Sequence, residues 1–243
     1  MAPLIEVRNL HYRYPDGTQA LRGIDFQLHA GETVILLGRN GSGKTTFVLH
    51  LNGLLQGEGE IRVCGLGMAK ANLAEIRRRT GVLFQEADEQ LFMPTVVEDV
   101  AYGPLNLGCA PADARQTALR ALSDVGLEGC RDKAPYHLSA GEKRRAALAG
   151  VLAMSPDILI LDEPTTSLDP PAQTDLVRLL AALPQAKLIT THDTGLARAL
   201  GTRAVFFEEG RIVAEGGVEE LIHRFRWQPH HDWNSSAGSN GAD

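Results

Sequence analysis

The spacing of apolar residues predicts β-strands at the start of the chain and a mixture of strands and helices after it. Apolar and polar residues alternate in two early segments that flank a turn at residues 15–17, and a shorter strand follows a glycine-rich turn. These segments predict strands at residues 4–10, 23–28 and 57–63. Three later segments have helical spacing, most clearly where Leu119, Leu122 and Val125 share one face. They predict helices at residues 71–79, 113–125 and 141–154.

Short, largely apolar runs form a second pattern, which is typical of strands that are buried on both faces. These runs lie at residues 33–37, 158–161 and 187–191, and a hairpin around Glu209 and Gly210 is expected at residues 204–213. Because strands and helices alternate in this part of the chain, its sheet is expected to be parallel. The sequence therefore predicts the α/β fold class, with an antiparallel β layer beside a parallel core.

A glycine-rich segment joins the buried strand at residues 33–37 to a helix predicted at residues 46–52. It reads G-x-x-x-x-G-K-[ST], the phosphate-binding P-loop, and consists of Gly38, Arg39, Asn40, Gly41, Ser42, Gly43, Lys44 and Thr45. Its glycines allow positive φ angles, so that successive backbone N–H groups can turn inward around phosphate oxygens. Lys44 would bring a positive charge to the β- and γ-phosphates, and the Thr45 hydroxyl can ligate Mg²⁺.

Two carboxylates end the buried strand predicted at residues 158–161. In a P-loop enzyme the first, Asp162, holds Mg²⁺ directly or through water. The second, Glu163, points to a different spot and can accept a proton from an attacking water molecule. Taken alone, an acidic turn after a buried strand explains the pair equally well.

Composition narrows the possible partners. The chain has 243 residues, enough for one large α/β domain, and its formal net charge of -6 argues against a general nucleic-acid binder. Cys64, Cys109 and Cys130 show no metal-ligand spacing, which fits a reducing compartment rather than a disulfide framework. Neither a secretory signal nor a stretch of about 18 apolar residues is visible, so we expect any membrane role to come through a partner.

Residues 138–142 read L-S-A-G-E and resemble L-S-G-G-Q, the signature sequence of ATP-binding cassette (ABC) ATPases. The resemblance implies that Ser139 and Gly141 approach the γ-phosphate. The chain departs from the family sequence at Ala140 and at Glu142, where a charge replaces an amide. Ser139 and Glu142 also have the spacing of a capping box at a helix start. Both roles are compatible, because a helix N-terminus is itself an anion site.

Other motifs of this family follow in the family's order. Gln85 matches the Q-loop glutamine that reaches Mg²⁺ and water, residues 167–170 match the D-loop, and His192 matches the switch histidine. Tyr14 matches the aromatic residue that stacks on adenine, although Tyr12 is a rival for that role.

The resemblance implies a P-loop ABC ATPase domain with an antiparallel β subdomain and a helical subdomain, and ATP and Mg²⁺ as cofactors. The domain would span residues 4–222, its helical subdomain about residues 86–155, and a short tail residues 223–243. The implied catalytic residues are Glu163, as general base, and His192. Besides the P-loop, the implied ATP-binding residues are Tyr14, Thr46, Gln85, Ser139 and Gly141. The implied Mg²⁺ ligands are Thr45, Gln85 and Asp162.

Four stretches narrow the resemblance to the ATPases of energy-coupling factor importers, and among them to the cobalt/nickel type (CbiO-like). They are residues 12–21, 84–92, 95–104 and 138–145. This resemblance implies an ATP-hydrolysing subunit that powers cobalt or nickel uptake, peripheral on the cytoplasmic face of the cell membrane. Its implied partners are a second copy, joined through composite ATP sites, and integral membrane transmembrane and substrate-capture subunits, with no nucleic acid.

Two alternatives stay open at this point: the ATPase of another ABC importer or exporter, and a non-transport ABC ATPase of DNA repair or translation. The second class would show a long insertion between Gln85 and Ser139, a second cassette or a basic surface, and the sequence shows none of these. His223, His230 and His231 can bind Co²⁺ or Ni²⁺, but short His tracts more often bind metal weakly and without function. The sequence does not identify the transported solute.

Overall fold

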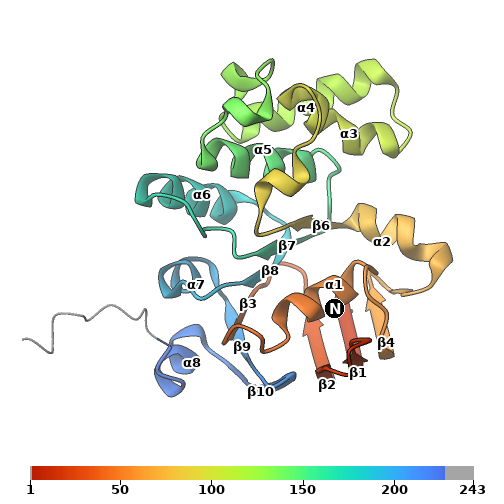
Figure 1. The fold of residues 1–243 in the computed structure, drawn as a ribbon, viewed down its shortest axis with the longest axis vertical. Coiled ribbons are helices and arrows are strands. Elements are labelled where there is room, and N and C mark those ends of the chain that lie inside the picture. Colours follow the sequence, from red (N-terminus) through yellow and green to blue (C-terminus); the bar gives the residue numbers. More distant parts are fainter. Residues whose placement is uncertain (1, 228–243) are drawn as a thin grey trace, which may run out of the picture.

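The computed structural model describes residues 2–227, apart from the side chains of residues 87 and 88, and contains two β-sheets (Figure 1). The antiparallel sheet comprises β1 (Ile5–Arg13), β2 (Gln19–Leu28), β4 (Glu58–Val63) and β5 (Leu66–Gly67) in the order β2-β1-β4-β5. The larger sheet comprises β3 (Thr33–Gly38), β6 (Thr80–Leu83), β7 (Ile158–Asp162), β8 (Ala186–Thr190), β9 (Arg203–Glu208) and β10 (Arg211–Gly216). Its strand order is β10-β9-β3-β8-β7-β6.

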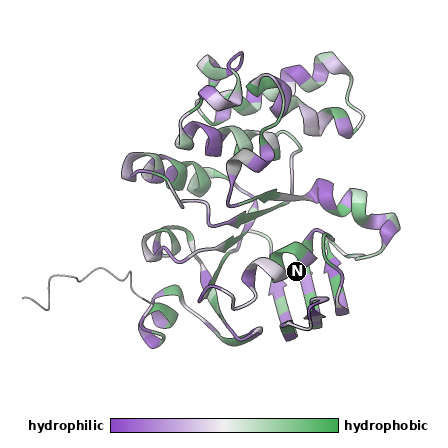
Figure 2. Ribbon diagram, viewed as in Figure 1, coloured by the Kyte–Doolittle hydropathy of each residue, from purple (hydrophilic) through white to green (hydrophobic). Residues whose placement is uncertain are grey.

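The central strands of the larger sheet are buried along their whole length. Every residue of β3, β7 and β8 is buried, and β9, β3, β8, β7 and β6 pair in parallel. Strands that are covered on both faces need apolar side chains at nearly every position, as these sequences have (Figure 2). The parallel core, the antiparallel layer and the β9–β10 hairpin predicted from the sequence are therefore confirmed.

Helices cover the parallel sheet and also form a layer of their own at one end of the molecule (Figure 1). The helices along the sheet are α1 (Lys44–Leu51), α2 (Leu73–Arg79), α6 (Pro170–Ala182), α7 (Thr194–Leu200) and α8 (Val218–Arg224). The separate layer consists of α3 (Val96–Asn106), α4 (Pro111–Asp124) and α5 (Ala140–Leu152). Val100, Leu122 and Ala149 belong to a hydrophobic cluster at the centre of this layer. The layer thus has its own core, and α5 joins it to the sheet, because Ala147, Leu148 and Val151 belong to the hydrophobic cluster that includes the sheet strands.

The structure also differs from the sequence prediction in several elements. The apolar spacing did not predict β6 or the helices α3, α6, α7 and α8. The helix expected from residue 71 begins as a 3₁₀ turn, and α4 and α5 each begin and end one or two residues earlier than expected. Helix α8 continues past residue 222, and Phe225 stacks on Phe206 with 3.7 Å between ring centroids. His230 and His231 lie outside the described residues.

Candidate functional site

A cavity of about 790 Å³ opens where β3 and β7 end. Ligand sites of parallel sheets lie at this carboxyl-terminal edge, where loops from distant parts of the sequence converge. The predicted site residues that line the cavity are Tyr14, Asn40, Gly41, Gly43, Lys44, Thr45, Thr46, Gln85, Asp162, Glu163 and His192. Gly38, Arg39 and Ser42 belong to the same loop without lining the cavity, and Ser139 and Gly141 line a different one.

The P-loop requires glycine at two positions where a side chain would not fit. Gly38 has a φ of 143°, and a Cβ atom there would collide with the carbonyl oxygen of Phe207. Gly43 has a φ of 106°, and its Cβ atom would lie 2.7 Å from the carbonyl oxygen of Ala20. Gly43 is also the N-cap of α1, so no side chain caps the first turn of this helix. Its N–H groups are therefore available to phosphate oxygens, and the helix dipole favours negative charge there.

The Lys44 ammonium group is buried against this loop. Its Nζ atom donates hydrogen bonds to the carbonyl oxygens of Gly38 at 2.6 Å and Arg39 at 3.1 Å. Burial lowers the pKa of Lys44, while the charges of Glu163 and Asp162 act in the opposite direction. A triphosphate in the cavity would give this charge strong acceptors.

Two hydroxyl groups orient the Asp162 carboxylate. Thr45 Oγ1 donates to Oδ2 at 3.3 Å, and Thr190 Oγ1 donates to Oδ1. Thr45 is the last residue of the P-loop, and Thr190 ends β8 next to Asp162 at the end of β7, so the parallel strands bring the three residues together. Hydroxyl and carboxylate oxygens are ligands that Mg²⁺ prefers, so this set of donors fits the ion.

Glu163 lies beside Asp162 but contacts a different group. Its φ of 47° is in the left-handed region, and its N–H donates to the carbonyl oxygen of Thr190 at 3.0 Å. Its carboxylate Oε2 lies 2.9 Å from Nδ1 of His192, whose side chain is largely exposed while that of Glu163 is buried. A carboxylate paired with an imidazole at a cavity wall can take up a proton from a bound water molecule.

The segment around Gln85 is held from the helical layer. Arg144 of α5 donates hydrogen bonds to the carbonyl oxygens of Phe84 at 2.7 Å and Gln85 at 2.5 Å. Gln90 accepts a hydrogen bond from the Phe84 N–H at 2.9 Å and donates to the carbonyl oxygen of Val82 at 3.0 Å. Burial lowers the pKa of Arg144, which the charges of Glu86 and Asp162 partly offset. Sequence reasoning missed Arg144, although a cation on the inner side of an otherwise apolar helix face is a signal for it.

The structure separates the two tyrosines that competed for one role. Tyr14 lines the cavity, and its hydroxyl lies 3.0 Å from Oγ1 of Thr46. Tyr12 does not line the cavity and instead packs against the hydrophobic core under the antiparallel sheet. Tyr14 is therefore the aromatic residue that is available to a ligand.

Ser139 and Gly141 line a second cavity of about 390 Å³, together with Ser167 and Asp169. Ser139 Oγ accepts a hydrogen bond from the Glu142 N–H at 3.3 Å, and the Glu142 carboxylate accepts one from the Ser139 N–H at 2.8 Å. The predicted capping box at the start of α5 is therefore confirmed. The structure does not bring these residues to the P-loop of the same chain.

Sequence reasoning also missed one side of the larger cavity, formed by Arg22 of β2 and by Glu209 and Gly210 in the β9–β10 turn. The Gly210 N–H donates to the carbonyl oxygen of Ser42 at 3.0 Å, and the Arg22 N–H donates to the Gly210 carbonyl oxygen at 2.8 Å. No local pattern marks these residues, because only the folded chain brings this hairpin against the P-loop.

Within residues 2–227, no helix combines the length and the apolar character that crossing a bilayer requires. Nor do the described residues contain a group of three or more His, Cys, Asp or Glu side chains that could hold a metal ion together. His223 lies near the end of α8.

The fold and the cavity define a P-loop nucleoside triphosphatase domain, with the phosphate-binding loop after β3 and a carboxylate pair after β7. More particularly, the chain belongs to the ABC transporter family, whose model matches residues 21–166. The sequence interpretation as an ABC ATPase is thus confirmed.

Three similar proteins define the chain's place more closely. It is 44% identical to the energy-coupling factor transporter ATP-binding protein EcfA of Methanothermobacter thermautotrophicus, over 90% of this chain and 72% of that protein. The structure of cbiO1 from Clostridium perfringens, described as part of the ABC transporter complex cbiONQ, matches with a TM-score of 0.83 and 34% identity over 93% of this chain and 92% of that one. The ATP-binding cassette MJ0796, in a dimeric post-hydrolysis state with ADP and Pi, matches with a TM-score of 0.79 and 28% identity over 88% of this chain and 98% of that one. The chain is therefore an ATPase and the ATP-binding subunit of an ABC transporter.

Proposed function

We propose that this ATPase powers an energy-coupling factor importer for cobalt or nickel, as a homodimer peripheral to the cytoplasmic face of the cell membrane. The main support for a dimer is that the P-loop and the Ser139–Gly141 segment, which the family resemblance assigns to one ATP site, line separate cavities of one chain. The similarity to EcfA and to cbiO1 supports this type of importer.

A second copy of the chain would complete each ATP site. Ser139 is exposed at the start of α5, so a partner can approach it without rearrangement of the monomer. A two-fold axis would bring Ser139 and Gly141 of each chain to the P-loop of the other and create two identical sites. ATP would then lie between the two chains and hold them together, and hydrolysis would release them.

The residues of the larger cavity would divide the chemistry among them. Glu163 would act as general base toward the attacking water, and His192, paired with it, would contact the γ-phosphate and position that water. Lys44 and the N–H groups of the P-loop would stabilise the developing negative charge. Thr45, Asp162 and Gln85 would hold Mg²⁺, which when bound neutralises charge on the β- and γ-phosphate oxygens.

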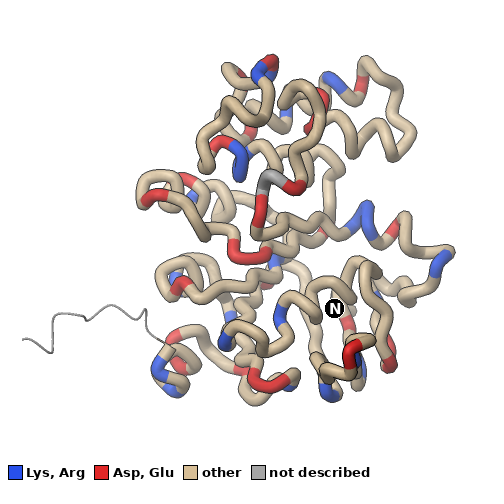
Figure 3. The backbone as a smooth tube through the Cα atoms, viewed as in Figure 1, with Lys and Arg blue, Asp and Glu red and all other residues tan. Residues whose placement is uncertain are grey.

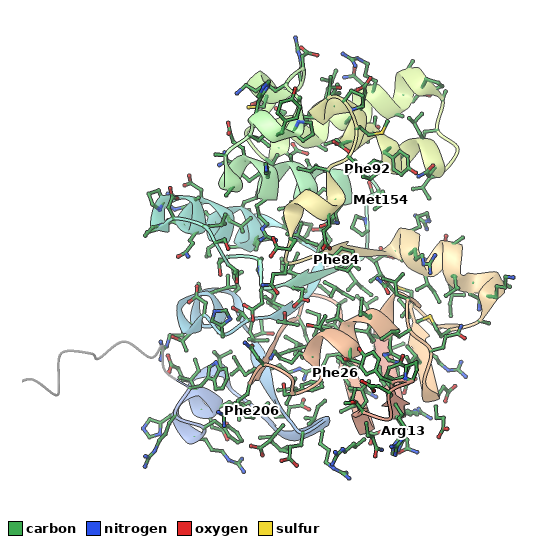
Figure 4. All side chains as sticks on the ribbon, viewed as in Figure 1. Arg13, Phe26, Phe84, Phe92, Met154 and Phe206 are labelled. Carbon is green, nitrogen blue, oxygen red and sulfur yellow. The ribbon has the colours of Figure 1, made fainter. Side chains whose placement is uncertain are left out.

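An apolar groove of about 320 Å³ is the proposed contact for a membrane subunit. It lies between α2, α3 and α5, and its lining residues include Tyr102. Phe92 and Met154, which also line it, are labelled in Figure 4. Phe92 is 61% exposed, and its ring meets Tyr102 edge-on at 5.0 Å. A contiguous exposed apolar surface beside the Gln85 segment is suited to receive a helix of an integral membrane protein.

A buried carboxylate in this groove has one oxygen to which no described residue donates a hydrogen bond. Asp99 is only 8% exposed, and its Oδ1 accepts hydrogen bonds from the N–H groups of Phe92 and Met93 at 2.9 Å each. Its Oδ2 is buried and has no hydrogen-bond partner among the described residues. Burial raises the pKa of Asp99. Because Oδ2 is unpaired within the described part of the chain, a positively charged donor on the docked helix would find an acceptor that these residues do not satisfy and would favour the ionised carboxylate.

We expect Asp99→Asn to weaken association with the membrane subunits at least about tenfold, because a charged partner in the groove would lose its counter-charge. An asparagine carbonyl can still accept from Phe92 and Met93, so the fold and the ATPase activity of the isolated chain should persist. Phe92→Ser should weaken the association as well, and Val213→Ser, an exposed apolar residue on β10, serves as control. Co-purification of tagged chain with its membrane subunits measures the effect. Equal yields for all three variants would move the docking surface away from this groove.

The proposed domain limits and the absence of a nucleic-acid partner rest on packing and charge. We propose an ATPase domain that begins at residue 4, with a helical subdomain at about residues 86–155 around the separate hydrophobic cluster. The limit expected at residue 222 falls within α8, and Phe225 and Trp227 pack against the core, so the domain continues at least to residue 227. Basic and acidic residues are interspersed along the described chain (Figure 3), and the formal net charge is -6, which does not favour binding to phosphate backbones.

Reconstitution tests the proposed ion directly. The chain and the integral membrane proteins that co-purify with it would be placed in liposomes with ATP and Mg²⁺, and uptake of Co²⁺ and Ni²⁺ measured. We expect ATP-dependent uptake of one or both ions, and none when Glu163→Gln replaces the wild-type chain. ATP hydrolysis without uptake of either ion would overturn the proposed solute but not the ATPase.

A further inference from the structure

A closed ring of contacts joins the aromatic residue of the cavity to the helix that follows the P-loop. Tyr14 and Tyr12 meet edge-to-face with 4.9 Å between ring centroids, and Tyr12 meets the His50 ring in the same way at 4.7 Å. His50 Nδ1 lies 2.7 Å from the carbonyl oxygen of Thr46. Thr46 Oγ1 lies 3.0 Å from the Tyr14 hydroxyl and closes the ring. Strand β1 and helix α1 are thereby linked at the cavity through four side chains.

His50 has a fixed position and no free space around it. Its side chain is fully buried, and burial lowers its pKa, so the imidazole is neutral at pH 7. Because a carbonyl oxygen only accepts, Nδ1 must carry the proton, and Nε2 has no partner among the described residues. A Cβ atom on Gly57 would lie only 3.1 Å from Nε2. The ring therefore acts as a rigid support rather than as a ligand group.

Only one member of this set of aromatic rings faces the cavity that contains the P-loop. Tyr14 lines the cavity, whereas Tyr12 and His50 do not. Tyr14 lies just beyond the end of β1, and its N–H donates to the Thr18 carbonyl oxygen at 2.9 Å in a turn. The turn fixes its backbone, but the tilt of its half-exposed ring depends on Tyr12 and on the Thr46 hydroxyl.

We propose that Tyr12 and His50 are positioning residues that hold the Tyr14 ring at the correct distance and tilt from the P-loop for stacking on the base of the nucleotide. They set the affinity for the base without touching the nucleotide, because a ring that is already oriented loses less conformational freedom on binding. The inference rests on the stacking of adenine on Tyr14, which the family resemblance implies and which we add to the proposed function here.

Binding of ATP and of inorganic tripolyphosphate separates base recognition from phosphate recognition. Tyr12→Leu should raise the Kd for ATP about three- to tenfold, the usual size of a lost aromatic contact, and leave the Kd for tripolyphosphate unchanged. The KM for ATP should rise in proportion while kcat stays the same. Tyr12→Phe should behave as wild type, because no hydrogen bond of the Tyr12 hydroxyl exists among the described residues. His50→Leu, an apolar replacement in a buried site, should have the same effects on both Kd values as Tyr12→Leu. Agreement between the two variants guards against a folding defect in one of them.

Tyr14→Ala distinguishes failure of this inference from failure of the proposed function. If Tyr14→Ala leaves ATP binding unchanged, the proposed stacking is wrong and the positioning role falls with it. If Tyr14→Ala weakens ATP binding while Tyr12→Leu and His50→Leu do not, stacking stands and the positioning role is overturned. Equal loss of ATP and tripolyphosphate affinity in Tyr12→Leu would also overturn it, because the residue would then support the P-loop helix as a whole.

Discussion

Replacement of Glu163 by Gln is expected to keep ATP binding and to lower turnover by about 10²–10⁴-fold, the usual cost of losing a general base. The amide keeps the size of the side chain and can still contact His192, which lies 2.9 Å away in the wild type. It cannot accept a proton from water at neutral pH. Because ATP would bind and not be hydrolysed, the variant should accumulate as an ATP-bound dimer. Phosphate release measures the turnover, and size-exclusion chromatography with light scattering measures the dimer.

The matched control for this variant is Glu209→Gln, which removes a carboxylate from the β9–β10 side of the same cavity. Both changes alter the net charge of the cavity equally, but only Glu163 is paired with His192 and adjacent to Asp162. Turnover should therefore stay within about threefold of wild type in Glu209→Gln, well below the loss expected for a missing base. Near-normal hydrolysis by Glu163→Gln, or an equal loss in both variants, would remove Glu163 from the role of base.

Local patterns predicted the sheet better than they predicted the helices. Strands β3, β7 and β8 are buried on both faces, so their sequences are largely apolar runs that need no tertiary information to detect. Helix α3 was missed because Gly103 and Pro104 interrupt its helical pattern, although Thr95 and Glu98 form a capping box at its start. Helix α6 begins with Pro170 and Pro171 after the capping side chain of Asp169, a helix start that can be recognised from sequence.

The parts of the site that lie within one motif were accessible from the sequence, and those that depend on packing were not. The phosphate-binding loop, Lys44 and Thr45 come from one run of eight residues, and the pair Asp162 and Glu163 ends one apolar strand. The order of the residues alone therefore places these groups. The choice between Tyr12 and Tyr14 needed the fold, because residues two apart in a strand share a face and alternation cannot separate them. Tyr14 reaches the cavity because β1 ends at Arg13, whereas Tyr12 stays in the strand and packs against the core. Arg144 likewise acquires its role only where α5 meets the Gln85 segment.

Replacement of Lys44 by Ala is expected to lower the affinity of the isolated chain for ATP about tenfold or more, because the phosphates lose a charge-assisted contact. The buried ammonium group donates hydrogen bonds to the carbonyl oxygens of Gly38 and Arg39, and these bonds hold it at the P-loop. Its loss acts in the monomer, before any partner is involved. Titration with a fluorescent nucleotide measures this effect at protein concentrations too low for dimerisation. The loss of affinity in Lys44→Ala is also the reference for Ser139→Arg.

Ser139→Arg is expected to leave ATP binding by the monomer intact, to prevent the ATP-bound dimer and to abolish hydrolysis. Ser139 lines the second cavity with Gly141, apart from the P-loop of its own chain, so a large cation there obstructs only the site that a partner would complete. Because the substitution also removes the capping oxygen of α5, Ser139→Ala is the matched control, with an expected cost of about 1 kcal/mol in stability and no steric block. Adding Ser139→Arg to the Glu163→Gln chain should convert its ATP-bound dimer to monomer in size-exclusion chromatography. If Ser139→Arg instead weakens nucleotide binding by the monomer as much as Lys44→Ala does, the two cavities are not halves of one shared site, and the composite-site proposal is wrong.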